Sequence, residues 1–196
     1  GTHMAFEDIG LVRLIPNATI FEASDSAMLG YLLKKAASEY GIHYIRTIRK
    51  KAVKIYNQQE TFEAGKGKVL REGKDVTIIA SGIMVAESLL AADWLLEKGL
   101  EATVIDMYSI KPIDKELIIK YAKITKAVVT AENHNVIGGL GSAVAEVLSE
   151  NCPVLMKRIG VKEQFGQVGT TEYLKKFYKL TSSDIAEAAL ELVKQR

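Results

Sequence analysis

The stretch Thr103-Val-Ile-Asp-Met-Tyr-Ser-Ile-Lys-Pro-Ile-Asp114 decides the fold class, because one element ends and another begins within it. It opens with a β-branched run bounded by charge, which is typical of a buried parallel strand. Pro112 ends that strand, since proline cannot donate a hydrogen bond to a β-ladder. Asp114 then stands where a helix over residues 115–123 needs its N-cap. The stretch therefore predicts a strand, a turn and a helix in succession.

The same alternation continues on both sides of this stretch. The sequence predicts strands at 102–108, 127–131 and 154–159, and helices at 84–98, 115–123, 138–149, 170–178 and 183–194. Strands that alternate with helices predict a mostly parallel sheet with helices on both faces. Residues 68–71 and 76–80 are expected to pair with each other as a β-hairpin and so to add one antiparallel edge strand.

Residues 1–49 predict a smaller unit that comes first in the chain. It consists of a helix at 5–15, a strand at 18–22, a helix at 27–40 and a strand at 43–49. This order is half of a doubly wound sheet, which exposes its strand edges unless other strands cover them. Residues 50–66 show little periodicity and are interpreted as a linker. We therefore expect an α/β protein with a partial doubly wound domain at 1–49 and a second domain at 67–196.

The composition is that of an ordinary globular protein, with 48% hydrophobic and 26% charged residues among 196. A net charge of +2 gives no reason to expect a nucleic acid or a membrane as a partner, and the apolar runs are too short to span a bilayer. The single Cys152 cannot form an internal disulfide, which fits a cytoplasmic protein. The chain begins at Gly1 without an initiator methionine, so residues 1–4 are either a remnant of a cleaved tag or part of something longer.

Two polar or glycine-rich motifs invite a functional interpretation. Gly139-Leu-Gly141 resembles part of a dinucleotide-binding fingerprint, but Val144 stands where the third glycine is required. Close packing of a helix on the sheet explains these glycines more simply. Glu132-Asn133-His134 could form a metal site or an acid/base cluster, but two ligands without a third nearby are poor evidence for zinc. We favour a polar rim that makes hydrogen bonds across an interface.

Arg46 and Arg49 are candidates for binding an anion. They lie three residues apart on a predicted strand, and hence on its opposite faces. One side chain is then solvated, and the other could meet an anionic ligand at the carboxyl end of the strand, where a guanidinium suits phosphate. The residues alone leave both options open, and they name no reaction.

Several motifs together resemble the transketolase family. They are Thr2-His3 followed by Glu7-Asp8, Arg13 and Pro16-Asn17; Tyr44–Arg49 with Ile55-Tyr56-Asn57; Asp106; Ile110-Lys-Pro-Ile-Asp114; Glu132-Asn133-His134; and Gly138-Gly-Leu-Gly141. The resemblance covers essentially the whole chain, and it favours Thr2-His3 as native residues. Deoxyxylulose-5-phosphate synthases and the beta subunits of 2-oxo acid dehydrogenases share some of these patterns. Transketolase is favoured by Met4–Asp8, by residues 55–57 and by His134.

The resemblance implies a thiamine diphosphate enzyme of the pentose phosphate pathway, which moves a two-carbon ketol unit between sugar phosphates. His3 falls on the family's histidine near the first carbons of the donor sugar, where it would act in catalysis as a hydrogen-bond donor. Arg49 falls on the arginine that clamps the substrate phosphate, although Lys50 departs from several relatives. The complete enzyme also needs a divalent metal such as magnesium and is expected to be a homodimer.

Other parts of the family pattern have no counterpart in residues 1–196. These are the pyrophosphate domain with its metal motif and the glutamate that activates the cofactor. We therefore expect the isolated chain to bind no thiamine diphosphate tightly, to be inactive, and to need an amino-terminal transketolase section as a partner. Half a sheet leaves apolar surface uncovered, which favours a homo-oligomer. The alternative from another class is a non-catalytic α/β interaction module in which Arg49 binds a regulatory anion.

Overall fold

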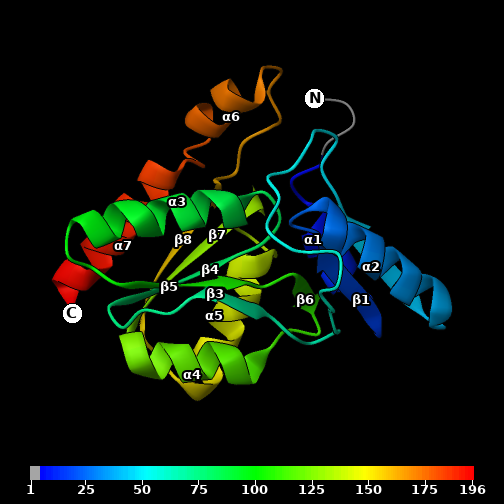
Figure 1. The fold of residues 1–196 in the computed structure, drawn as a ribbon, viewed down its shortest axis with the longest axis horizontal. Helices are drawn as coiled ribbons and strands as arrows, with labels where there is room; N and C mark the ends of the chain where they lie inside the picture. Colours follow the sequence, from blue (N-terminus) through cyan, green and yellow to red (C-terminus); the bar gives the residue numbers. More distant parts are fainter. Residues whose placement is uncertain (1–4) are drawn as a thin grey trace.

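The structure is a computed structural model that describes residues 5–196, and it contains two β-sheets (Figure 1). The smaller sheet has the strand order β2-β1-β6, and the larger has the order β3-β5-β4-β7-β8. The strands are β1 (Ala18–Glu22), β2 (Ile42–Arg46), β3 (Lys68–Arg71), β4 (Val76–Ala80), β5 (Ala102–Asp106), β6 (Ser109–Lys111), β7 (Ala127–Asn135) and β8 (Leu155–Val161). Apart from the pairings of β3 with β5 and of β6 with β1, the neighbours run parallel, so the predicted α/β class is confirmed.

Helices cover both faces of the larger sheet. The helices of residues 5–196 are α1 (Asp8–Arg13), α2 (Ser26–Ser38), α3 (Met84–Glu97), α4 (Lys115–Thr125), α5 (Leu140–Asn151), α6 (Thr171–Phe177) and α7 (Ser182–Gln195). Those packed on the larger sheet are α3, α4, α5 and α7, whereas α1 and α2 pack against the smaller sheet. One hydrophobic cluster joins the sheet to α3 and α7, and a second joins the opposite face to α4 and α5. Figure 1 shows α3 and α7 on one side of the sheet and α4 on the other. In residues 5–196, no helix combines the length and the hydropathy that crossing a bilayer requires.

The stretch around Pro112 folds as its residues predict. Every residue of β5 is buried, and the strand pairs in parallel with β4. The Asp114 carboxylate accepts a hydrogen bond from the amide of Leu117 at 3.0 Å, which caps α4. α4 begins four residues after β6 ends, and it packs against one face of the larger sheet.

The predicted β-hairpin is wrong, although its antiparallel edge strand is confirmed. β3 pairs with β5 rather than with β4, and β4 lies between β5 and β7. All five residues of β4 are buried, as expected of a central strand with both faces covered, and β5 and β7 pair with its two edges. The connection between β3 and β4 instead bonds to the start of β5, where Thr103 Oγ1 donates to the carbonyl oxygen of Gly73 at 2.7 Å.

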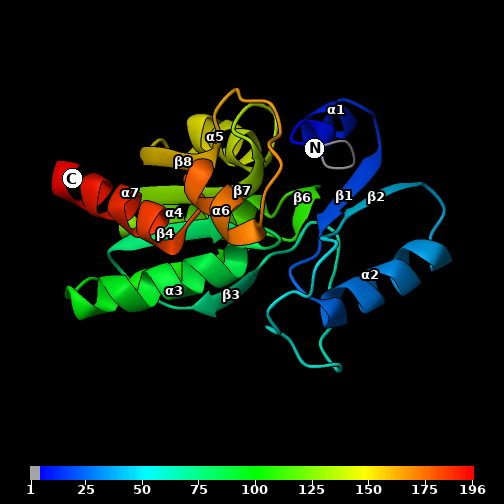
Figure 2. The same cartoon turned by 90° about the horizontal axis from the view of Figure 1, so that it is seen from above.

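The predicted strand 102–108 is shorter in the structure, and a further strand that follows it belongs to the other sheet. β5 ends at Asp106, and β6 pairs antiparallel with β1, with Ile20 opposite Lys111. Figure 2 shows β6 beside β1, between the larger sheet and α2. The smaller sheet is therefore covered on one edge by a strand from the second part of the chain, which the sequence did not predict.

Residues 50–66 contain no helix or strand, but two of their aromatic side chains are buried. The ring of Phe62 packs edge-on against Tyr56 and Tyr108, with ring centroids 5.0 and 5.3 Å apart. Asp25 Oδ2 accepts hydrogen bonds from the amides of Ile55 and Tyr56 at 2.9 and 2.8 Å. The segment is thus a packed strap that holds β1 and α2 against the larger sheet.

Candidate functional site

A cleft of about 550 Å³ opens at the carboxyl end of β2. Its walls are Ala5 and Asp8 at the start of α1, residues 44–49, and Asn133 from β7. β1 and β2 are parallel, so both strands direct their carboxyl ends to this side of the smaller sheet. This edge is the common place for a ligand in open α/β folds.

The structure separates the two candidate arginines. β2 ends at Arg46, so Arg49 lies in the loop that follows and not on the same strand as predicted. Arg49 is exposed on the wall of the cleft and has no ion pair among residues 5–196. The side chain of Arg46 is only 11% exposed and is paired with two carboxylates. Of the two, Arg49 is the cation that a ligand in the cleft can reach.

Arg46 is held by contacts in three directions. Its Nε donates to Asp8 Oδ2 at 2.9 Å, one terminal nitrogen donates to Glu22 Oε1 at 2.6 Å, and the other donates to the carbonyl oxygen of Ala5 at 2.9 Å. Tyr44 also donates to Asp8 Oδ2, at 2.6 Å. Burial and this hydrogen bond raise the pKa of Tyr44 to about 12, so its hydroxyl remains a donor at neutral pH.

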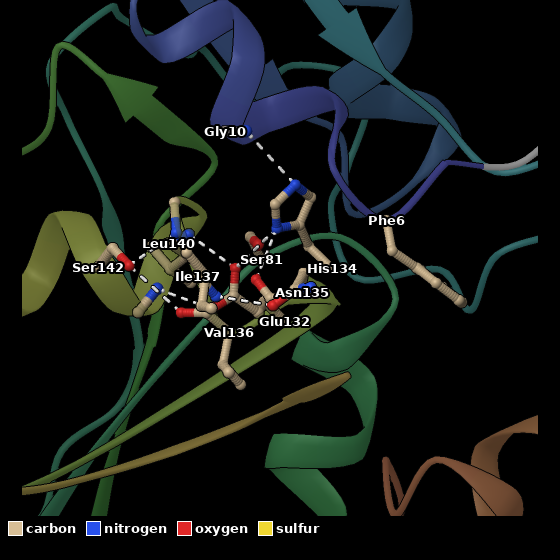
Figure 3. A network of polar contacts seen from close by, with 12 residues as sticks. Phe6, Gly10, Ser81, Glu132, His134, Asn135, Val136, Ile137, Leu140 and Ser142 are labelled. Carbon is tan, nitrogen blue, oxygen red and sulfur yellow. Dashed lines mark hydrogen bonds and ion pairs between the residues drawn. The ribbon is translucent and has the colours of Figure 1, made fainter. Parts of the chain in front are cut away.

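Glu132 and His134 lie near the end of β7 (Figure 3). His134 Nε2 is 3.8 Å from Asp8 Oδ1, so the pair adjoins the network of Arg46. The two oxygens of Glu132 accept hydrogen bonds from the amides of Leu140 and Gly141, at 2.7 and 2.8 Å, in the first turn of α5. Burial raises the pKa of Glu132 to about 8, although the two amides act in the opposite direction. The glycine pair has a packing role, since a Cβ atom at Gly139 would lie 2.0 Å from Glu132 Oε2.

His134 joins β7 to α1. Its Nδ1 lies 2.7 Å from the carbonyl oxygen of Asn135, and its Nε2 accepts a hydrogen bond from the amide of Gly10 at 3.4 Å (Figure 3). We assign the proton to Nδ1 from these two partners. Burial lowers the pKa of His134, so the ring is neutral at neutral pH. These bonds confirm the interpretation as interface hydrogen bonds, and β7 extends to Asn135 rather than ending at residue 131.

The structure describes only one of the two predicted site residues, Arg49. His3 lies outside the described residues, so its catalytic role stays a prediction. Arg49 lines the cleft as a substrate-binding residue should, but its ligand also stays a prediction. The sequence did not predict the buried pairing of Arg46 with Asp8 and Glu22, because these partners are 38 and 24 residues away along the chain.

A metal site requires several ligating side chains around one ion. Within residues 5–196, no group of three His, Cys, Asp or Glu side chains is placed to hold a metal ion. Glu132 and His134 are committed to the amides and the carbonyl already described. We therefore assign none of the residues 5–196 to a metal ion.

Comparisons with known proteins identify the family. Residues 65–185 match the family described as "Transketolase, C-terminal domain". The chain belongs to this transketolase family. A solved structure described as "Split gene transketolase, inactive beta4 tetramer" has 46% sequence identity with the chain and a TM-score of 0.93, over 98% of this chain and 63% of that one. Transketolase structures from Pichia stipitis at 18–19% identity, with a TM-score of 0.76, support the fold alone.

Other transketolase relatives resemble the chain over nearly all of its length. It is 48% identical over 196 residues to "6-deoxy-6-sulfo-D-fructose transketolase subunit SqwH" of Clostridium sp. (strain MSTE9), and 40% identical over 197 residues to "Putative transketolase C-terminal section" of Methanocaldococcus jannaschii. The chain spans 61% of each of these two proteins. It is also 38% identical to a 1-deoxy-D-xylulose-5-phosphate synthase of Heliobacterium modesticaldum, of which it spans 30%.

Proposed function

We propose that the chain is the carboxy-terminal section of a thiamine diphosphate-dependent transketolase, which transfers a two-carbon ketol unit between sugar phosphates. In this proposal Arg49 binds the anionic end of the sugar. One observation carries the assignment of Arg49: it is exposed on the cleft wall, whereas the neighbouring Arg46 is already neutralised by Asp8 and Glu22.

The chemistry of the cleft fits an anionic substrate. A guanidinium offers two parallel N–H donors to phosphate, and the exposed Lys50 and Lys51 directly after Arg49 add positive charge. Thiamine diphosphate, when bound to the complete enzyme, supplies the carrier for the two-carbon unit. The residues of this chain would then bind and orient the sugar, with His3 donating a hydrogen bond near its first carbons.

The complete enzyme needs a partner in this proposal. The chain spans 61% of its transketolase relatives, and a similar chain is described as an inactive β4 tetramer. We propose an amino-terminal transketolase section that brings the site for the diphosphate and for a metal such as magnesium, and a homo-oligomer of the resulting unit. The chain alone is then inactive.

A sulfonated sugar is a second candidate substrate, because a relative at 48% identity is named for 6-deoxy-6-sulfo-D-fructose. A sulfonate presents three oxygens to a guanidinium, as a phosphate does, but carries less charge at neutral pH. Arg49 suits both groups. Comparison of kcat/KM for a ketose 6-phosphate and for the matching 6-sulfonate separates the two candidates.

The test is reconstitution. The chain is mixed with an amino-terminal transketolase section, thiamine diphosphate and Mg²⁺, and ketol transfer to an aldose phosphate is followed. We expect turnover from the mixture and none from either section alone. Formation of deoxyxylulose 5-phosphate from pyruvate instead would favour the synthase, and no turnover with any donor would favour a non-catalytic module.

Arg49→Ala tests the phosphate contact in the same mixture. Loss of a charge-assisted pair costs about 1.5–3 kcal/mol, so KM for a phosphorylated ketose should rise about 10- to 100-fold. A ketose without phosphate should be used as well as before. Lys123→Ala is the matched control, because Lys123 is an exposed cation on α4, away from the cleft. Equal losses on both donors would remove the proposed role.

A further inference from the structure

We propose that Arg46 is a positioning residue, which fixes the backbone at Ala5 and the first turn of α1 relative to Arg49. This proposal rests on the proposed function, because its consequence is the placement of the segment that follows His3 beside the bound sugar. Three observations carry it. They are the direction of the three contacts of Arg46, the lack of helix or strand in residues 5–7, and a hydrogen bond from Asn135 of β7 to Phe6.

The guanidinium of Arg46 links four parts of the chain. It extends from β2, the strand that leads to Arg49, and it bonds to the Asp8 side chain and to the Ala5 carbonyl oxygen. Its contact with Glu22 ties this cluster to β1, and the other oxygen of Glu22 accepts a hydrogen bond from Ser81, in the loop after β4. The beginning of α1 is therefore joined to the smaller sheet through Arg46, and to the loop after β4 through Arg46 and Glu22 together.

Residues 5–7 depend on such contacts for their position. They precede α1 and form neither helix nor strand, so no β-ladder fixes them. A second anchor comes from β7, where the amide of Asn135 donates to the carbonyl oxygen of Phe6 at 2.8 Å. The ring of Phe6 also packs edge-on against Tyr178, with ring centroids 5.2 Å apart, and Figure 3 shows Phe6 beside the end of β7. Arg46 therefore holds Ala5 and Asp8, while Asn135 holds Phe6 between them.

Arginine suits this role better than lysine. The guanidinium is planar and directs its donors to three acceptors at once, whereas an ammonium group is a compact charge on a flexible stem. Arg46→Lys keeps the charge beside Asp8 and Glu22 but cannot keep all three contacts. A positional error of about 1 Å can lower a rate by about 100-fold, so the loss is expected in kcat.

The control is the other arginine that anchors α1. Arg13 lies at the end of the helix, where it donates to the carbonyl oxygen of Gly138 at 2.9 Å and to Glu146 at 2.6 Å. Arg13→Lys therefore disturbs the same helix, with the same change of residue type, at the end away from Ala5. We expect its kcat to stay within about twofold of the wild type.

The experiment uses the reconstituted complex with phosphorylated and unphosphorylated ketose donors. Arg46→Lys should lower kcat about 100-fold for both donors, with KM for the phosphorylated donor nearly unchanged. Tyr44→Phe, which removes one hydrogen bond to Asp8, should have the same effect to a smaller degree and serves if Arg46→Lys does not fold. A kcat within twofold of the wild type for both variants, or a loss confined to KM for the phosphorylated donor, would overturn the proposal.

Hydrogen exchange provides a readout that does not depend on activity. In the chain carrying Arg46→Lys, a peptide covering residues 5–10 should exchange faster than in the wild type, while a peptide from α4 should be unchanged. If the wild-type complex shows no ketol transfer, the proposed function fails and the exchange measurement alone decides. Unchanged exchange over residues 5–10 would then refute the positioning role.

Discussion

Asp106→Asn should remove a pH-dependent part of the stability of the chain. Asp106 ends β5 and is fully buried, and its Oδ2 accepts a hydrogen bond from the hydroxyl of Tyr56 at 2.8 Å. Its Oδ1 has no hydrogen-bond partner among residues 5–196. Burial raises the pKa of Asp106 to about 7, although the hydroxyls of Ser24 and Tyr56 act in the opposite direction, and the nearby Glu22 and Asp25 add to the rise. Asparagine keeps the oxygen that faces Tyr56 and carries no titratable group.

The sign and the size of the effect follow from linkage. A carboxyl whose pKa is higher in the folded state stabilises that state fully below its unfolded value of 3.8, and this contribution is lost as pH rises to about 7. Each pH unit in this window costs about 1.4 kcal/mol. The slope falls to half as pH reaches the folded pKa, so between pH 5 and pH 7 the wild type should lose about 2 kcal/mol relative to Asp106→Asn.

The assay is urea unfolding of both proteins at pH 5, 6, 7 and 8. Other groups with shifted pKa values, such as Glu132 and His134, are present in both proteins, so subtraction of one curve from the other isolates Asp106. We expect the difference in the free energy of unfolding to change by about 2 kcal/mol in favour of the variant between pH 5 and pH 7 and to level off above pH 7. A constant difference over this range would show that Asp106 is ionised throughout, and would refute the reasoning.

Three further substitutions test the contacts of the strap and of the loop after β4. Asp25→Ala removes the N-cap of α2 and the acceptor of two strap amides, so urea unfolding should show a loss of about 3 kcal/mol, and a loss below 1 kcal/mol would contradict these contacts. Phe62→Ala empties a buried aromatic site and should cost about 3–5 kcal/mol by the same assay, whereas a freely mobile linker would show almost no change. Gly82→Ala should cost about 2 kcal/mol in thermal unfolding, because φ is +56° there and the new Cβ would lie 2.8 Å from the Glu22 carboxyl group; an unchanged melting temperature would contradict this.

Most of the fold could be predicted because its signals are local. The bounds of β1, β3 and β4 were predicted as observed, since each is a short apolar or β-branched run between turn residues. The cap of α4 by Asp114 was predicted from its position after Pro112. Alternation of strands and helices was sufficient for the parallel sheet and for the helices on its two faces.

The pairing of the edge strands could not be predicted, because it depends on distant partners. β3 and β4 are four residues apart, which favours a hairpin locally, but β5 and β7 occupy both edges of β4. β6 has only three residues and directly follows β5, so its own sequence does not show that it pairs with β1. In both cases tertiary packing outweighs the local preference.

The site was predictable only in part for a similar reason. The position of Arg49 and its charge are visible in the sequence, and the resemblance to transketolases assigns its role. The neutralisation of Arg46 is not visible, because Asp8 lies on a helix that the sequence places far from β2. The role of Glu132 is also hard to predict from the sequence. Its two carboxylate oxygens accept hydrogen bonds from the first turn of α5, and the only local signal is the pair of glycines, Gly139 and Gly141, that lets the helix approach the carboxylate.

The charges around β2 explain why the two arginines cannot exchange roles. Arg46 faces two carboxylates, so the cluster of Arg46, Asp8 and Glu22 carries an excess negative charge and repels an anion more than it attracts one. Attraction of a sugar phosphate must then come from Arg49 and the lysines that follow it. Because the buried arginine takes no part in that attraction, its replacement by lysine changes geometry at constant charge, whereas replacement by alanine would also leave the two carboxylates unpaired. Lysine is therefore the substitution that separates positioning from electrostatics.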